Sequence, residues 1–250
     1  MTNVPHKTYF NWSSGKDAAL ALYHLQRDPN YSIQGLVTTL NSHHERVTMH
    51  GLRKRLLQQQ VEVLQLIDST GQKSNTDLYT VELPEHANME IYEKVLGEQM
   101  MALKAAGYSH SAFGDIFLEE LRQYREQQLS AFGIKPVFPL WGRDTKTLLQ
   151  EFIQLGFKAI VVCIQSELLD QSFVGREIDA AFIEDLPANV DPCGENGEFH
   201  TFCYDGPIFT QPVGFTKGEK IFRTYPAPKD EQGQSQKEDY GFWFIDLIPE

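Results

Sequence analysis

The pattern of apolar and polar positions predicts that strands and helices alternate along the chain. Residues 7–12 alternate aromatic and polar side chains, as a strand does, and lead into a short polar turn. After the turn, apolar residues have the spacing of one helical face: Ala18, Ala21, Leu22 and Leu25. The chain therefore opens with a strand, a polar turn and a helix.

The same alternation continues through about the first half of the chain. Three further strands are predicted at residues 32–40, 78–83 and 109–116. Each is followed by a predicted helix, at residues 50–66, 90–106 and 119–132. Strands that alternate with helices of this length are typical of a parallel sheet with helices on both faces. We therefore expect an α/β fold.

The second half has a different pattern. Its predicted elements are an extended, proline-containing segment, a helix with Asp144 as its N-cap and Gly156 at its end, a buried strand, a short helix and a final strand. The extended segment lies at residues 135–141, the buried strand at 158–164, the short helix at 175–182 and the final strand at 240–248. Residues 191–206 concentrate glycines, acids, one histidine and two cysteines, and residues 226–239 have the composition of a solvated linker.

Composition and charge narrow the class of protein. The chain has 250 residues, of which 41% are hydrophobic and 12% aromatic, so a disordered, collagen-like or coiled-coil protein is excluded. With 22 basic and 34 acidic residues, its net charge of −12 argues against a general nucleic-acid binder. The longest apolar run, residues 159–164, is too short to span a bilayer, and the N-terminus lacks the apolar stretch of a signal peptide. Three cysteines without a CxxC pair favour a reducing compartment, so we expect a cytoplasmic protein.

The first turn has the residues of an anion site. A loop between a strand and a helix directs backbone N–H groups and the positive end of the helix dipole toward one point. Ser13 and Ser14 add hydroxyl donors, Gly15 lets a phosphate approach the backbone, and Lys16 neutralises its charge. Asp17 would repel a phosphate directly, so its presence suggests a bridging Mg²⁺. Because serine and aspartate are also favoured helix caps, an ordinary capped helix explains the same residues.

Residues 10–22 resemble the PP-loop of the N-type ATP pyrophosphatases, which has the pattern Ser-Gly-Gly-x-Asp-Ser after a first strand. Within that superfamily, the chain resembles the diphthine ammonia ligase branch. Further matching motifs follow in the expected order at residues 46–51, 113–116, 139–141 and 193–207. The resemblance covers residues 7 to about 222, and its last motif is the most specific. It implies a Rossmann-like PP-loop domain at residues 1–130, a smaller α+β substrate-binding domain at 131–225, and a linker with a C-terminal strand at 226–250.

The resemblance also implies an activity. ATP and Mg²⁺ would bind on the first domain, and a substrate carboxylate would attack the α-phosphate, releasing pyrophosphate and leaving an acyl adenylate. Ammonia would then displace AMP and form an amide. Residues 13–17 would hold the phosphates, with Lys16 and Asp17 also catalytic and Asp17 the metal ligand.

Three further residues are expected at the nucleotide site: His50, Gly114 and Asp115. Asp115 lies where a second strand-end carboxylate would face the same crevice. Two of them have a structural alternative: a histidine beside Gly51 more often simply begins a helix, and Asp115 can be a turn residue after Gly114.

The last motif supplies the expected catalytic residues Glu195, Glu198 and His200. Acids interleaved with aromatic rings suit a cationic ligand, including the quaternary ammonium that diphthine carries. His200 is suited to accept a proton from an attacking amine. A solvated hairpin with Gly197 at its turn is the alternative interpretation.

Four positions depart from the family pattern. Ser14 replaces a glycine and Ala18 the closing serine of the loop, which stiffens the loop and removes one phosphate-binding hydroxyl. In the last motif, Asn196 replaces a glycine and His200 the final glutamate, a change that bears on the substrate.

Three functions are therefore open. The first is an ATP-dependent amide ligase that acts on ammonium and a carboxylate acceptor, which is protein-borne on an elongation factor if the chemistry is of the diphthamide type. The second is a PP-loop enzyme that adenylates a nucleobase of tRNA, against which the net charge argues. The third is an adenine-nucleotide-binding module without turnover, which the alanine at position 18 favours. Neither a membrane nor a nucleic acid is expected as a partner.

Overall fold

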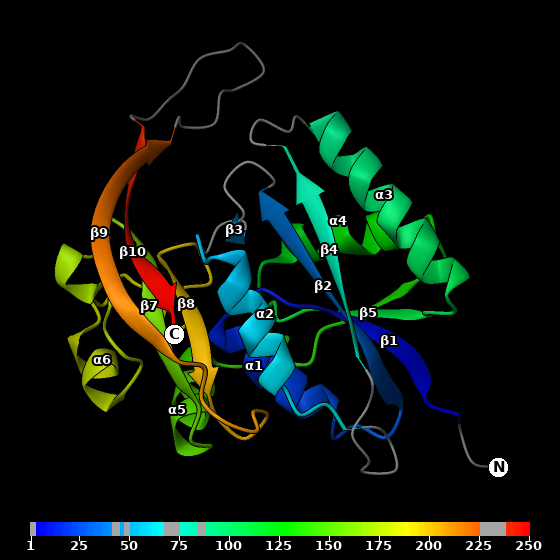
Figure 1. Cartoon of the computed structure of the whole chain (residues 1–250), viewed down its shortest axis with the longest axis horizontal. Helices are drawn as coiled ribbons and strands as arrows, with labels where there is room; N and C mark the ends of the chain where they lie inside the picture. The colour runs from blue at the N-terminus through cyan, green and yellow to red at the C-terminus, as the bar shows by residue number, and fades with distance from the viewer. Residues whose placement is uncertain (1–3, 42–45, 48–50, 68–75, 85–88, 226–238) are drawn as a thin grey trace.

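The computed structural model describes most of the chain and contains two sheets (Figure 1). The described residues are 4–41, 46–47, 51–67, 76–84, 89–225 and 239–250. The predicted histidine of the nucleotide site, His50, lies outside them. Within these ranges, no helix is long and apolar enough to cross a membrane.

The first sheet has the order β3-β2-β1-β5-β6, and β4 also pairs with β2. Its strands are β1 (His6–Asn11), β2 (Tyr31–Asn41), β3 (Arg46–Val47), β4 (Asp77–Leu83), β5 (His110–Ala112) and β6 (Lys135–Val137). All pair in parallel except the two-residue strand β3, which is antiparallel to β2. This is the predicted Rossmann-like α/β arrangement, and the proline-containing segment at β6 lies at the sheet edge, as expected.

Helices cover both faces of this sheet (Figure 1). Helices α1 (Lys16–Leu25) and α2 (Lys54–Val63) lie between the two sheets, and α3 (Met89–Ala105) and α4 (Glu119–Ser130) cover the opposite face. Both faces of strand β1 are apolar because helices cover both faces of the sheet. Phe10 belongs to the core around α1 and α2, whereas Tyr9 packs in the cluster under α3 and α4.

The second sheet is antiparallel, with the order β8-β7-β10-β9. Its strands are β7 (Lys158–Gln165), β8 (Phe199–Asp205), β9 (Phe215–Tyr225) and β10 (Tyr240–Pro249), accompanied by the helices α5 (Thr145–Gln154) and α6 (Ala180–Asp185) and the 3-10 helix η1 (Gln171–Phe173). The last strand docks back between β7 and β9, as predicted. A continuous apolar cluster joins this sheet to α1 and α2, and the domain boundaries at residues 130 and 225 stay a prediction.

The predicted helix at residues 175–182 is wrong in its first part. Gly175 lies in a turn with a φ of 82°, and residues 176–178 run beside β7. Gly175 N donates to Val161 O at 2.8 Å, and Ile178 N donates to Ala159 O at 2.9 Å. The helix begins only at Ala180, after Asp179 accepts a hydrogen bond from Phe182 N. This segment therefore lies beside β7 like a short additional strand. The spacing of its apolar residues resembles that of a helix and did not indicate this pairing.

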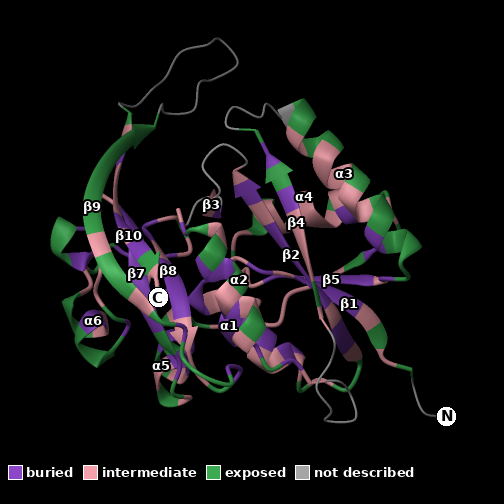
Figure 2. Ribbon diagram, in the orientation of Figure 1, coloured by how far each residue is buried: buried purple, intermediate pink, exposed green. Residues whose placement is uncertain are grey.

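Other differences concern the ends of elements. Strand β5 ends at Ala112, four residues earlier than predicted, and α2 begins at Lys54 instead of residue 50. Strand β9 was not predicted at all, because most of its residues are exposed and the segment lacks an apolar alternation (Figure 2). The predicted cap of α5 is confirmed, since Asp144 Oδ1 accepts from Thr147 N at 2.8 Å.

Candidate functional site

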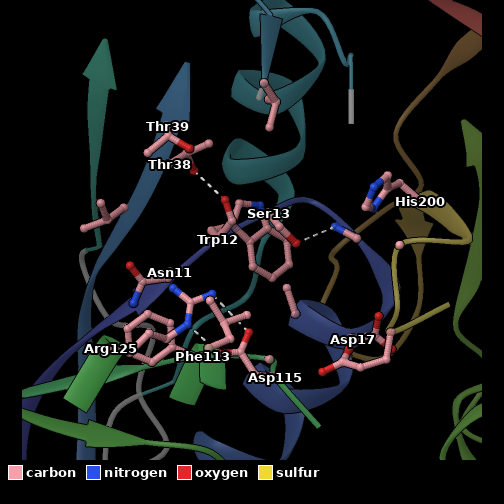
Figure 3. A pocket seen from close by; sticks show the side chains of 18 of the residues that line it. Asn11, Trp12, Ser13, Asp17, Thr38, Thr39, Phe113, Asp115, Arg125 and His200 are labelled. Carbon is pink, nitrogen blue, oxygen red and sulfur yellow. Dashed lines mark hydrogen bonds and ion pairs between the residues drawn. The ribbon is translucent and has the colours of Figure 1, made fainter. Parts of the chain in front are cut away.

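A pocket of about 470 Å³ opens where β1, β2 and β5 end (Figure 3). Its volume is in the range typical of small-molecule sites, and the carboxyl ends of parallel strands are where such sites form in α/β folds. Its polar end includes Ser13, Gly15, Lys16, Asp17, Asp115, Glu195 and His200. Toward α3 and α4 the lining is mostly apolar: it includes Tyr92, Leu96, Met100, Phe113, Leu121 and Tyr124, together with the polar α4 residues Arg125 and Gln128.

The loop between β1 and α1 is suited to an anion. Gly15 is the N-cap of α1, so the positive end of the helix begins at the pocket wall without a capping side chain. Ser13 Oγ accepts from Gly15 N at 3.3 Å, and Lys16 N donates to Thr201 Oγ1 of β8 at 3.0 Å. The loop is therefore fixed by the second sheet while Ser13 and Gly15 face the cavity.

Ser14 shapes this loop from behind. Its φ of 72° lies in the left-handed region, which glycine adopts more readily than serine. Its side chain is fully buried, and its Oγ has no hydrogen-bond partner among the described residues. Its carbonyl accepts from Cys203 N at 2.9 Å and from Gln60 Nε2 at 3.2 Å. The predicted phosphate-binding hydroxyl is thus placed in the wall of the site and not among the pocket-lining side chains.

Lys16 and Asp17 form a buried ion pair at the polar end. Lys16 Nζ lies 2.7 Å from Asp17 Oδ2 and also donates to the carbonyl of Cys193, and only 3% of its side chain is exposed, against 28% for Asp17. Burial acts to lower the pKa of Lys16, but Asp17 together with Cys193 and Glu195 raises it, so the pKa lies above its ordinary value. Burial raises the pKa of Asp17 despite the opposing effect of Lys16. The ammonium group thus stays charged, and part of its hydrogen-bonding capacity is already used.

Glu195 and His200 reach the pocket from the second half of the chain (Figure 3 shows His200). Glu195 Oε1 accepts from Ile116 N at 2.7 Å. Burial raises the pKa of Glu195 to about 7, and the nearby carboxylates of Asp17 and Asp115 add to the rise. A carboxyl group with this pKa can give up or accept a proton near neutral pH.

Glu198 does not line the pocket. Its side chain is buried and accepts hydrogen bonds from Asp191 N at 2.9 Å, Asn196 N at 2.9 Å and Asn196 Nδ2 at 3.0 Å. The Asp191 carboxylate in turn accepts from the backbone N–H groups of Cys193 and Glu195. The two acids hold the loop that presents Glu195, so the structure separates the two predicted glutamates.

Asp115 forms a two-point ion pair with Arg125 of α4, and both side chains line the pocket (Figure 3). Arg125 Nε lies 2.5 Å from Asp115 Oδ2, and the guanidinium group is 4.2 Å from the centre of the Phe113 ring. Gly114 is required by close packing, because a Cβ there would lie 2.9 Å from Ala18 N at the start of α1. The chain after β5 therefore fits directly against the start of α1.

Gln60 is a central residue that the sequence analysis missed. It is fully buried in α2, accepts from Trp12 Nε1 at 2.8 Å, and donates to Cys203 O at 2.6 Å and to Ser14 O at 3.2 Å. It thereby joins α2, the phosphate loop and β8. The available signal was an amide four residues after Leu56, on the apolar face of the helix.

The predicted metal ligand is Asp17, and the donor atoms around it decide which kind of metal site it suits. Among the described residues, no group of three or more histidine, cysteine, aspartate or glutamate side chains could hold a metal ion. Mg²⁺ bound with a nucleotide needs only one or two carboxylates, since phosphate oxygens and water complete its octahedron. Asp17, at the polar end of the pocket, fits that smaller requirement.

Comparisons with known proteins agree with the motifs. The family described as diphthamide synthase C-terminal domain matches residues 144–226. The diphthine–ammonia ligase of Bos taurus is 30% identical over 119 residues, which cover 46% of this chain and 45% of that protein. The human enzyme of the same name is 26% identical over equal shares, and that of Schizosaccharomyces pombe is 26% identical over 38% of this chain and 16% of its own length. The matched segment thus spans less than half of these relatives, and the findings support a diphthine–ammonia ligase-like family.

Proposed function

We propose that this diphthine–ammonia ligase-like protein binds ATP in the pocket and uses it to convert a substrate carboxylate into an amide, releasing pyrophosphate and AMP. One observation carries the proposal: the polar end of a single pocket combines the positive start of α1 and Lys16 with Glu195, whose pKa is about 7. The first group suits phosphates, and the second suits proton transfer from a nitrogen nucleophile.

The nucleotide fits the two ends of the pocket. Its phosphates would lie at Ser13 and Gly15, with the charge of Lys16 close by. Its base would lie among the apolar side chains of α3 and α4, where rings and aliphatic groups predominate. Mg²⁺ held by Asp17 would supply charge neutralisation for the leaving pyrophosphate.

The chemistry takes two displacements. A carboxylate oxygen of the acceptor forms a bond to the α-phosphorus while the bond to the bridging oxygen breaks, and pyrophosphate leaves. The nitrogen of ammonia then attacks the acyl carbon, and AMP leaves with the electron pair of the broken C–O bond. The nitrogen must lose a proton along this path, and Glu195 is positioned at the pocket to accept it. His200, on β8, also lines the pocket and would be a second group close to the acceptor.

The test is the fate of ATP with Mg²⁺, ammonium and a panel of carboxylate acceptors. We expect AMP and pyrophosphate from the unchanged protein, and loss of both products in Asp17→Asn. We expect Glu195→Gln to retain ATP binding but to form amide slowly. Glu184→Gln on α6, an exposed glutamate outside the pocket, is the matched control. Formation of ADP and phosphate would contradict the proposal.

The pH profile of amide formation identifies the role of Glu195. If this carboxylate accepts the proton, the rate rises as pH increases through about 7, because the ionised form is the active one. The rise attributable to this group disappears in Glu195→Gln. An unchanged profile in that variant assigns the proton transfer to another group.

A second candidate is a nucleotide-binding module without turnover. Lys16 is already bonded to Asp17 and to the carbonyl of Cys193, and Ala18 supplies no hydroxyl at the loop. Calorimetry that shows ATP binding, together with no pyrophosphate release for any acceptor, would favour this alternative.

A further inference from the structure

The outer strand of the second sheet is long, exposed and paired on one side. β9 is the terminal strand in the order β8-β7-β10-β9, and it spans 11 residues (Figure 1). Figure 2 shows it exposed along most of its length. Large apolar side chains lie there, with Ile221 39% and Phe222 48% exposed. An edge of this kind is a template for pairing with another strand.

The lysines of β9 do not block this edge. Lysine is a common protection of edge strands when its side chain extends into solvent beside the backbone. Here Lys217 Nζ donates to Gly175 O at 2.9 Å and Lys220 Nζ to Gln171 O at 3.2 Å, so both side chains fold back over the same molecule. Glu219 and Arg223 are exposed, and neither takes part in an ion pair among the described residues.

The register with β10 defines the faces of β9. Lys220 pairs with Ile245 and Lys217 with Leu247, so the strand has a bulge between them and both lysines lie on one face. Because side chains alternate, Glu219, Ile221 and Arg223 share the other face. Ile221 is therefore flanked on one face of the strand by two residues of opposite charge, Glu219 before it and Arg223 after it.

We propose that two copies of this chain associate through antiparallel pairing of their β9 strands, with the two-fold axis at Ile221. In antiparallel sheets, directly opposed side chains lie on the same face, so this centre places Glu219 of each copy opposite Arg223 of the other. The two Ile221 side chains meet at the axis. The sheets of the two copies join into one, and both copies satisfy their exposed strand edges.

Neighbouring registers lack this complementarity. A centre at Glu219 brings two carboxylates together, and a centre at Lys220 brings two ammonium groups together, which is unfavourable for directly opposed pairs. A centre at Phe222 places Arg223 opposite Ile221 and leaves its charge unpaired. The charge pattern of β9 therefore selects the Ile221 register.

The first test is the molar mass in solution, measured by light scattering over a dilution series. We expect a mass twice that of the chain for the unchanged protein, and a shift to the single-chain mass for Arg223→Glu, which places two carboxylates opposite each other. The double variant Glu219→Arg with Arg223→Glu restores the opposite charges and therefore the dimer. Lys146→Glu, a charge reversal on the exposed side of α5, is the matched control and stays dimeric.

The second test reads the register by disulfide cross-linking. With the axis at Ile221, Ile221→Cys places the two thiols opposite each other at cross-strand distance, which suits a disulfide. Lys220→Cys places its thiols on the other face and farther from the axis. The native cysteines, Cys163, Cys193 and Cys203, are buried and do not compete. We expect a cross-linked dimer on mild oxidation for the first variant only.

Three results would overturn the proposal. The first is a single-chain mass for the unchanged protein at every concentration. The second is a dimer that Arg223→Glu does not weaken, or that the double charge exchange does not restore. The third is cross-linking through residue 220 as readily as through residue 221. Circular dichroism of each variant establishes that it is folded, since all of the altered residues are exposed.

Discussion

Replacing Gln60 by methionine removes the hydrogen bonds that hold the phosphate loop against α2 and β8. Methionine has a similar length and shape, so Gln60→Met leaves little cavity and isolates the polar contribution. The indole N–H of Trp12 loses its acceptor at 2.8 Å, and the carbonyls of Cys203 and Ser14 lose a donor. The Ser14 carbonyl keeps its bond from the Cys203 amide.

The size of the effect follows from these three contacts. A buried donor left without an acceptor costs about 1–3 kcal/mol, and each lost neutral hydrogen bond about 0.5–1.5 kcal/mol. Gln60→Met should therefore reduce the free energy of unfolding by about 2–6 kcal/mol, a large part of the total for a domain of this kind. Because Trp12 and Ser14 flank the loop that holds the phosphates in the proposed function, nucleotide affinity should fall as well.

The assay is urea denaturation followed by circular dichroism, with Gln58→Met as the matched control. Gln58 lies two residues away on the same helix but is exposed, so its replacement should change the free energy of unfolding by less than about 0.5 kcal/mol. If the two variants unfold at the same denaturant concentration, the hydrogen bonds of Gln60 do not stabilise the loop and the reasoning is refuted.

Three further substitutions test the site and the first sheet. Ser14→Gly should raise stability by about 1 kcal/mol, since glycine relieves the left-handed φ of 72° and removes a buried hydroxyl without a described partner; a lower melting temperature would contradict this. Gly114→Ala should abolish nucleotide binding in calorimetry, because the new Cβ would lie 2.9 Å from Ala18 N. Gly97→Ala in α3 is the control: its new Cβ has no contact nearer than 3.5 Å, so this substitution should stabilise the protein by about 1 kcal/mol. Burial, a neighbouring imidazole and two lysines lower the pKa of His110 to about 4, so the unfolded state binds more protons between pH 6.5 and 4. The free energy of unfolding should fall as pH drops through this window, and His110→Asn should remove that part of the slope.

The fold was predictable wherever burial is periodic. Strands such as β1 and β7, and helices such as α1 and α5, were located within a few residues because their apolar positions repeat with one clear period. β9 was missed because both of its faces are largely exposed. The segment at residues 175–178 was assigned as a helix because sequence spacing could not show that Ala159 and Val161 on β7 offer it backbone partners.

The sequence predicts most of the residues at the candidate site, but not the hydrogen bonds that position them. The loop residues around Lys16 and the later motif with Glu195 were expected to serve one site, and the structure brings both to one pocket. That Ser14 faces the protein interior depends on β8, which lies almost 190 residues later in the chain. The position of Gln60 on the apolar face of α2 indicates that it is buried, but its partners come from two other segments, and no local pattern identifies them.

The two glutamates of the last motif show why a shared motif does not assign a shared role. Glu198 already accepts from three N–H groups in its own loop, so its oxygens are used in fixing the shape of that loop. Glu195 accepts from a single backbone N–H, that of Ile116, and faces a cavity with two other carboxylates nearby. Its pKa of about 7 follows from this shortage of donors combined with burial. Under the proposed function, proton exchange with a bound nucleophile would therefore fall to Glu195, and Glu198 would hold the loop that presents it.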